Sequence, residues 1–262
     1  MTAQHQTWLD YRAWRGGHHT VAGSLFVRPQ MWSPQLHNYR TTVVYLPPSY
    51  FQSERRYPVL YMHDGQNLFD RATAFVGQEW EVDETLENLS SEGIEAIVVG
   101  LYNHGNDRLY EYNPFRHVRH GRGEDYVAFI ADTVKPQIDH DFRTQPERKT
   151  TGIMGSSMGG LISIYGFFQR PDIFGLAGVM SPSVWFGGSA LYDFIRQRPY
   201  NDGRIYLDNG TRENSARKLN ALLHERGYRD NETLKYVVEQ DGEHTESAWA
   251  RRLPDALRFL LG

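Results

Sequence analysis

The stretch TTGIMGSSMGGLISIYGFF, residues 150–168, decides the fold of this chain and its candidate chemistry. It begins as a short apolar strand, passes through the pattern Gly-x-Ser-x-Gly at residues 155–159, and continues as an apolar helix. A sharp strand-to-helix turn of this kind presents a serine hydroxyl at a helix N-terminus, where it can act as a nucleophile. The stretch therefore predicts a chain of alternating strands and helices with a catalytic serine at one turn.

The glycine register selects which of the two adjacent serines would attack. In so tight a turn, the residues two before and two after the nucleophile need to be nearly free of side chain. Ser157 has Gly155 and Gly159 at these positions, whereas Ser156 has a methionine at both. We therefore expect Ser157 to be the nucleophile.

The rest of the chain alternates apolar strands with amphipathic helices, which is typical of a mostly parallel sheet flanked by helices. The first two strands have no helix between them, so we expect an antiparallel pair at the sheet edge. Pro136 is expected to bend or end the first part of its helix. Helices are expected at residues 80–93, 124–142, 158–169, 218–227 and 246–261. Eight strands are expected, at residues 20–28, 39–46, 57–65, 94–103, 149–155, 176–185, 204–211 and 234–242.

Length and composition limit the class of protein. A chain of 262 residues has the length of one large α/β domain, so we expect a single domain over residues 1–262. A net charge of −4 without a basic block argues against nucleic acid as a partner. The lack of cysteine excludes a thiol nucleophile and cysteine-ligated zinc. The first 20 residues contain no long apolar run, so we expect no signal peptide, no membrane partner and a cytoplasmic location.

A serine nucleophile needs a histidine base, and His244 has the expected place in the chain. It follows the last predicted strand and precedes the last helix. His224 lies within a helix of surface character and is expected to be solvated. His117 and His120 form an H-x-x-H pair, but the arginines around it and the lack of a further ligand argue against a metal site. We therefore expect His244 to be the base, with no metal and no cofactor.

The acid that orients the base should follow the strand RIYLDNG, because triad members occur in the order serine, acid, histidine in this kind of fold. Asp208 stands at the end of that strand and Glu213 in the following loop. Asp208 could instead cap the turn, and Glu213 could be a solvated loop charge. Spacing alone does not choose between the two carboxylates.

Two main-chain N–H groups are expected to hold the oxyanion formed during ester cleavage. The N–H of Met158 is at the start of the helix after the nucleophile. A second donor is expected in the loop HDGQNLFD, residues 63–70, where Gly65 lets the chain turn and the N–H of Gln66 is the preferred donor. Gly65 is also expected to contact the substrate.

Six separated motifs give the chain a family resemblance: YMHDGQNLFD, NDRLYEYNP, GSSMGGLISIYG, FGLAGVMSPSVW, LDNGTREN and DGEHTESAWARRLPDAL. Together they resemble the putative esterase family of α/β-hydrolases, which includes ferric-enterobactin esterase-like proteins, S-formylglutathione hydrolases and feruloyl esterases. The resemblance spans roughly residues 20–260 and implies an α/β-hydrolase fold. It also implies Ser157 as nucleophile and His244 as base. The family's acid commonly follows a Gly-Thr segment, which favours Glu213 over Asp208.

The resemblance further suggests that Arg108 and Glu111, with Tyr112, line or brace the site; a structural Arg108–Glu111 ion pair is the equal alternative. Only about 18 residues, 187–204, separate SPSVW from the next strand, too few for a large cap domain. We therefore expect an open, shallow site. Its expected walls, formed by Trp185 with Tyr102 or Phe69, would suit a bulky and partly exposed substrate.

These observations predict a serine carboxylesterase that acts through a Ser-His-acid triad and an acyl-enzyme. The expected substrate is a short-acyl or bulky exposed ester, of the acylated sugar or siderophore type. Acyl transfer by the same triad is one alternative, and a non-catalytic binding protein with this fold is another. The sequence does not indicate an oligomeric state.

Overall fold

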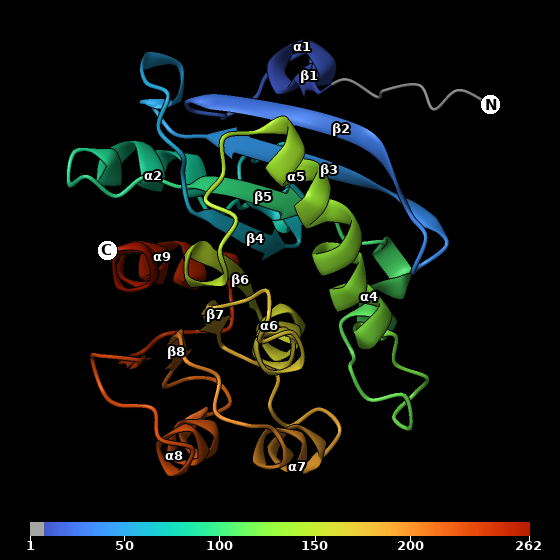
Figure 1. Ribbon diagram of the computed structural model, residues 1–262, viewed down its shortest axis with the longest axis vertical. Coiled ribbons are helices and arrows are strands. Elements are labelled where there is room, and N and C mark those ends of the chain that lie inside the picture. Colours follow the sequence, from blue (N-terminus) through green and yellow to red (C-terminus); the bar gives the residue numbers. More distant parts are fainter. Residues whose placement is uncertain (1–7) are drawn as a thin grey trace.

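The computed structural model describes residues 8–262, which form one nine-stranded sheet with helices on both faces (Figure 1). The strand order across the sheet is β1-β2-β3-β5-β4-β6-β7-β8-β9. All eight expected strands are present, and the ninth is the two-residue β1 at the edge. The strands are β1 Leu9–Asp10, β2 Ser24–Ser33, β3 Asn38–Leu46, β4 Val59–His63, β5 Ile97–Leu101, β6 Thr151–Ser156, β7 Leu176–Met180, β8 Arg204–Gly210 and β9 Leu234–Glu239.

The sheet is mixed in the way the sequence predicts. The first three strands and the β3–β5 pair are antiparallel, and the six strands from β5 to β9 run parallel. Strands β4, β5, β6 and β7 are buried along their whole length, as parallel strands covered on both faces should be. The architecture is therefore the expected α/β-hydrolase type.

Two hydrophobic cores lie on opposite faces of the sheet. One contains buried side chains of α4 to α8, such as Phe129 and Phe167, and the other those of α1, α2 and α9, such as Leu86 and Leu253. The helices are α1 Tyr11–Arg15, α2 Val82–Ser90, α3 Arg108–Glu111, α4 Gly123–Phe129, α5 Lys135–Asp141, α6 Met158–Gln169, α7 Ala190–Gln197, α8 Arg217–Glu225 and α9 Glu246–Leu261.

The helix expected over residues 124–142 forms without a break at Pro136. It consists of α4, a π-helical segment over Ile130–Val134, and α5. Pro136 lies in the first turn of α5, directly after the segment in which the hydrogen-bond pattern widens. The chain thus changes its hydrogen bonding around the missing N–H of Pro136, and the first α-helical part ends before the proline.

The order of the strands sets the place of the site. The chain leaves β4 for its neighbour β5 on one side and returns to β6 on the other side. Ligands of open α/β sheets bind at such a reversal of strand order, beyond the carboxyl ends of the strands. Residues 187–204 contain only α7 and form no cap domain over this edge. No helix within residues 8–262 combines the length and the apolar character needed to cross a membrane.

Candidate active site

Ser157 stands on a strained turn between β6 and α6. Its backbone angles, φ 58° and ψ −122°, lie in a region that non-glycine residues rarely occupy. The N–H of Ser157 donates to the carbonyl of Met180 on β7 at 3.0 Å, which holds the turn against the sheet. The nucleophile elbow predicted from the sequence is therefore present as a local structure.

The positions where the structure leaves no room for a side chain differ in part from the two glycine positions of the motif. A Cβ on Gly155 would lie 2.8 Å from the His63 ring, so a side chain is excluded there. A Cβ on Gly159 would lie 3.5 Å from the nearest atom, which is ordinary contact, so that expectation is not met. The close approach on the helix side falls on Gly160, whose Cβ would lie 2.8 Å from the Met180 carbonyl oxygen.

The structure brings His244 and Glu213 together at the other side of the site. The Nδ1 atom of His244 lies 2.6 Å from Oε2 of Glu213. A carboxylate can only accept, so Nδ1 carries the proton and Nε2 is left free to accept one. The His244 ring also packs edge-on against Trp249, with ring centroids 5.0 Å apart.

Glu213 is buried, and two further donors hold it. Its Oε1 atom accepts from the hydroxyl of Ser181 at 2.7 Å and from the N–H of Gly210 at 2.6 Å. Burial alone would raise the pKa of Glu213, but the hydrogen bonds from His244, Gly210 and Ser181 outweigh it and lower the pKa. Glu213 is therefore ionised and fixed in the orientation that a triad acid needs.

Asp208, the alternative acid, faces a different partner. One carboxylate oxygen accepts from the N–H of Ser181 at 2.9 Å, and the other lies 3.1 Å from Nε of Arg252. Burial raises the pKa of Asp208 to about 7, although Arg252 opposes that rise. The structure places Glu213, and not Asp208, against the base.

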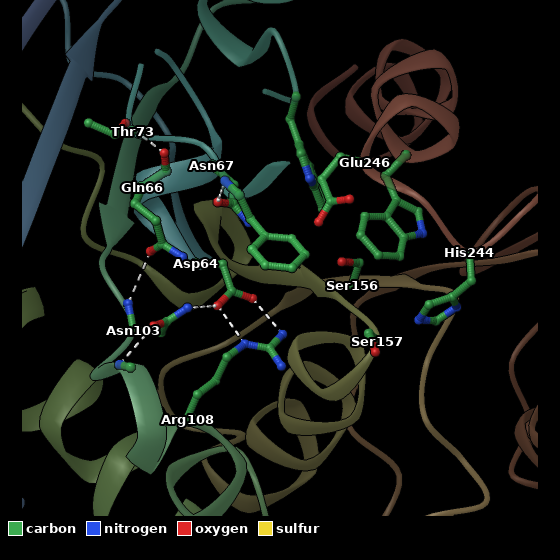
Figure 2. Close-up of a pocket in the computed structure, with 14 residues that line it drawn as sticks. Asp64, Gln66, Asn67, Thr73, Asn103, Arg108, Ser156, Ser157, His244 and Glu246 are labelled. Atoms are coloured by element: carbon green, nitrogen blue, oxygen red, sulfur yellow. Dashed lines mark hydrogen bonds and ion pairs between the residues drawn. The ribbon is translucent and has the colours of Figure 1, made fainter. Parts of the chain in front are cut away.

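Ser157 and His244 line the same cavity, which has a volume of about 590 Å³ (Figure 2). The hydroxyl of Ser157 lies 3.3 Å from that of Ser183, and no hydrogen bond joins Ser157 to His244 within the described chain. Hydrogen bonds between a nucleophile and its base are often loose in proteins without substrate and tighten when substrate binds.

The two expected N–H donors are free: Gln66 lines the cavity, and Met158 directly follows the lining residue Ser157 without being part of the lining. Gln66 belongs to a 3-10 turn, Gly65–Asn67, directly after β4, and Met158 is the first residue of α6. Within residues 8–262, neither main-chain N–H donates a hydrogen bond. The Gln66 side chain is oriented by the N–H of Asn103, which donates to its Oε1 at 3.2 Å. Both groups are therefore available to an oxyanion.

Gly65 has a packing role instead of the substrate contact expected from the sequence. It does not line the cavity. A Cβ on Gly65 would lie 2.5 Å from the carbonyl carbon of Gly100, so glycine is needed for the turn to approach β5.

Arg108 lines the cavity and binds Asp64 in a two-pronged ion pair, with both N–O distances 2.7 Å (Figure 2). Burial would raise the pKa of Asp64, but Arg108 outweighs it and the pKa is lowered. The hydroxyl of Tyr112 accepts from the N–H of Asp64 at 3.1 Å and so braces the pair. Glu111 pairs with Arg40 at 2.8 Å, so the alternative of an Arg108–Glu111 ion pair is wrong.

The aromatic walls of the cavity differ from those expected. Trp185 does not line it and is 61% exposed, beside Phe186. Phe69 is buried against Tyr45, and Tyr102 also lies outside the lining. The lining contains Phe75, Trp80, Trp249 and the carboxylate Glu246, whose pKa burial raises. Trp80 begins the helix expected at residues 80–93, with the pattern of a core residue. No local signal distinguishes a tryptophan that only packs in the core from one that also borders a cavity.

The remaining histidines do not add to the site. His117 and His120 are exposed, and no third ligand among the described residues completes a metal set with them. His224 is partly exposed in α8, as expected, and its Nε2 lies 3.2 Å from Asp230.

The fold and this site define an α/β-hydrolase-type esterase. The sequence model of the Putative esterase family matches residues 33–260, and the chain belongs to that family. An uncharacterized protein of Bacillus subtilis, YbbA, is 25% identical over 243 residues, covering 85% of this chain and 93% of YbbA. The endo-1,4-beta-xylanase/feruloyl esterase of Xylanibacter ruminicola is 28% identical over 70% of this chain, which corresponds to 24% of that larger protein.

A solved structure supports the same fold. The enterobactin esterase FES of Shigella flexneri superimposes with a TM-score of 0.73 at 21% identity, over 92% of this chain and 60% of that one. The family and its members named as esterases identify this chain as a carboxylic ester hydrolase. The alternative of a non-catalytic binding protein is therefore not retained.

Proposed function

We propose that this esterase acts through a triad of Ser157, His244 and Glu213. The observation that carries the proposal is the 2.6 Å contact between Glu213 and His244 Nδ1, at the cavity that Ser157 also lines. That contact holds a proton on Nδ1, so that in the neutral ring Nε2 is the atom that can act as a general base.

In the proposed reaction, the Ser157 hydroxyl attacks the ester carbonyl while Nε2 of His244 takes its proton. The N–H groups of Met158 and Gln66 hold the negative oxygen of the tetrahedral intermediate. The bond to the alcohol then breaks, and His244 returns the proton to the leaving oxygen. Water, activated by the same histidine, hydrolyses the acyl-enzyme and restores Ser157.

The proposed substrates are short-acyl esters or bulky, partly exposed esters of the acylated sugar or siderophore type. The cavity has tryptophan walls and no cap domain above it. Two relatives are named as a feruloyl esterase and as a ferri-bacillibactin esterase. A ranking of esters of these kinds by kcat/KM identifies the preferred class, and product analysis with a sugar acceptor separates hydrolysis from acyl transfer.

The test is the Ser157→Ala variant with p-nitrophenyl acetate. We expect kcat to fall by about 10³-fold or more, because the step that forms the acyl-enzyme is lost. Ser156→Ala is the matched control, because Ser156 also lines the cavity but lacks the elbow position. Near wild-type turnover by Ser157→Ala would refute the proposed nucleophile.

A further inference from the structure

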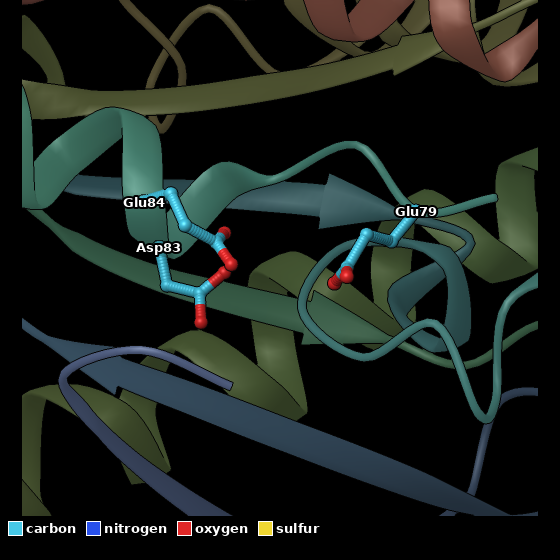
Figure 3. A group of neighbouring side chains, drawn as sticks. All are labelled: Glu79, Asp83 and Glu84. Carbon is cyan, nitrogen blue, oxygen red and sulfur yellow. The ribbon is translucent and has the colours of Figure 1, made fainter. Parts of the chain in front are cut away.

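A second group of acidic side chains lies away from Ser157, in the core on the α2 face of the sheet. Glu79 precedes α2, and Asp83 and Glu84 belong to its first turn (Figure 3). One oxygen of each residue lies within 4.8 Å of an oxygen of the other two. Glu79 is 1% exposed and Asp83 is fully buried. We call these three residues the α2 cluster.

Each member of the α2 cluster has a buried oxygen without a partner. These atoms are Oε2 of Glu79, Oδ1 of Asp83 and Oε2 of Glu84. The second oxygens of two members are anchored from the N-terminal segment. Thr20 donates its hydroxyl to Glu79 at 2.5 Å, and the N–H of Ala22 donates to Asp83 at 2.7 Å. The anchored oxygens fix the orientation of the free ones.

Three converging carboxylates, of which those of Glu79 and Asp83 are buried, need a compensating positive charge. A buried charge that is neither paired nor hydrogen-bonded is strongly unfavourable. Within residues 8–262, no lysine, arginine or histidine lies within 4.0 Å of a carboxylate oxygen of the α2 cluster, and Arg71 acts on Glu79 only from a longer distance. The N-terminus of α2 offers only a partial charge. The three free oxygens therefore form a ligand set without a cation supplied by the described chain.

We propose that the α2 cluster binds a divalent cation, with Ca²⁺ as the best fit. The donors are all carboxylate oxygens, which hard cations prefer, and no nitrogen or sulfur donor takes part. Ca²⁺ accepts irregular oxygen sets at about 2.3–2.6 Å, so two ligands can lie nearly 5 Å apart across it. Mg²⁺ requires about 2.0–2.1 Å and near-octahedral geometry, so an irregular set of three carboxylates suits it less well.

A cation in the α2 cluster would reinforce one wall of the active-site cavity. The N–H of Trp80 donates to the carbonyl of Asn67 at 2.8 Å, and both residues line that cavity. Glu79 is the neighbour of Trp80 in the chain. The cation would thus join the Thr20–Ala22 segment, the start of α2 and the Trp80 wall. This site does not depend on the identity of the nucleophile.

The competing explanation is a shared proton between Asp83 and Glu84, which the experiment separates from a cation. Full-length protein is treated with EDTA, and its melting temperature is measured at pH 8 with added CaCl₂ or MgCl₂. Bound Ca²⁺ should raise the melting temperature by about 5 °C or more at a hundredfold excess over Kd, and Mg²⁺ should raise it less. Titration calorimetry should give one site per chain.

Variants assign the effect to the cluster. Asp83→Asn and Glu79→Gln should each abolish the response to Ca²⁺, while Glu54→Gln, an exposed carboxylate elsewhere, should keep it. Absence of heat and of any thermal shift at 10 mM CaCl₂ would overturn the proposal and favour the shared proton. A full Ca²⁺ response in both Asp83→Asn and Glu79→Gln would also overturn it. The wild-type titration decides the question even where a variant does not fold.

Discussion

Two clusters of three carboxylates lie in the same chain and are compensated in opposite ways. In the first, the Nε or Nη1 atoms of Arg252 lie 3.1 Å from Asp208, 3.6 Å from Glu213 and 3.2 Å from Glu239. We call this the arginine cluster. The α2 cluster has no such side chain among the described residues. The arginine cluster thus carries its cation within the protein, which explains how it can hold an ionised Glu213 beside His244.

The difference is visible in the acidity of the two buried aspartates. Burial raises the pKa of Asp208 to about 7 in the presence of Arg252. Burial, together with Glu84, raises that of Asp83 to about 9. A guanidinium within the cluster therefore favours the charged form, and its absence favours either a proton or an external cation.

Ser181 connects the arginine cluster with the proposed triad through hydrogen bonds. It has a positive φ of 39°, and its N–H is held by Asp208. Its hydroxyl donates to Glu213 and accepts from Nε1 of Trp249 at 2.9 Å and from Arg252 at 2.7 Å. This small residue connects the buried arginine with the acid, and the acid with His244.

Within the arginine cluster, Glu213→Gln should have the largest effect on activity, because Glu213 is the member that contacts His244. We expect kcat/KM to fall by about 10²–10⁴-fold, because the amide no longer fixes the protonated Nδ1 of His244 or stabilises the imidazolium. Glu239→Gln is the control, since Glu239 contacts Arg252 without contacting the histidine. Equal losses in the two variants would contradict the special role of Glu213.

Arg252→Met removes the internal cation and should make the arginine cluster resemble the α2 cluster. We expect a loss of about 3–5 kcal/mol in the free energy of unfolding, because buried carboxylates are left uncompensated. Urea unfolding measures this loss. Arg251→Met, an exposed neighbour that pairs with Glu239, should cost about 0–1 kcal/mol. A similar small cost for Arg252→Met would show that the buried arginine is not needed.

Ser181→Ala should have an intermediate effect on activity. It removes one hydrogen bond to Glu213, so we expect kcat/KM to fall by about 3–10-fold, in line with a net hydrogen-bond value of about 1 kcal/mol. A purely structural role would lower stability without moving the pH profile of kcat/KM. A shift of its acidic limb to higher or lower pH would show that Ser181 acts through the Glu213–His244 pair.

The smallest expected effect concerns pH and Asp208. Its pKa is raised on folding, so between about pH 4 and about pH 7 the folded protein holds a proton that the unfolded chain has lost. This contribution to stability is present at low pH and is lost as the pH rises through about 7. From pH 5 to pH 7, the free energy of unfolding of the wild type should therefore decrease relative to that of Asp208→Asn. A difference independent of pH would contradict the raised pKa.

The sequence predicts the backbone of this structure better than its cavity. The apolar runs and helix periods locate eight strands and most of the helices, because these signals are local; α1, α3 and α7 are not predicted. The predictions of the elbow and of His244 follow from glycine register and chain order, since the ends of successive parallel strands meet at one edge. Chain order does not choose between Asp208 and Glu213, and only the family resemblance favours Glu213. The two-residue β1 is too short to leave a pattern.

The other contacts join distant residues, and no local pattern encodes them. Arg108 meets Asp64 across 44 positions, and Trp249 meets Ser181 across 68. The sequence therefore leaves an Arg108–Glu111 ion pair as an equal alternative and suggests Trp185 as a wall, and the structure shows neither. The α2 cluster could not be predicted for the same reason. In the sequence, Glu79, Asp83 and Glu84 have the pattern of ordinary surface charges at the start of an amphipathic helix.

The most direct test of the proposed nucleophile is the mass of the intact protein after reaction with a fluorophosphonate. We predict a single adduct that peptide mapping assigns to Ser157, absent in Ser157→Ala and formed much more slowly in His244→Ala. Failure of the wild type to form an adduct, or an adduct on Ser156 or Ser183 instead, would contradict a catalytic Ser157.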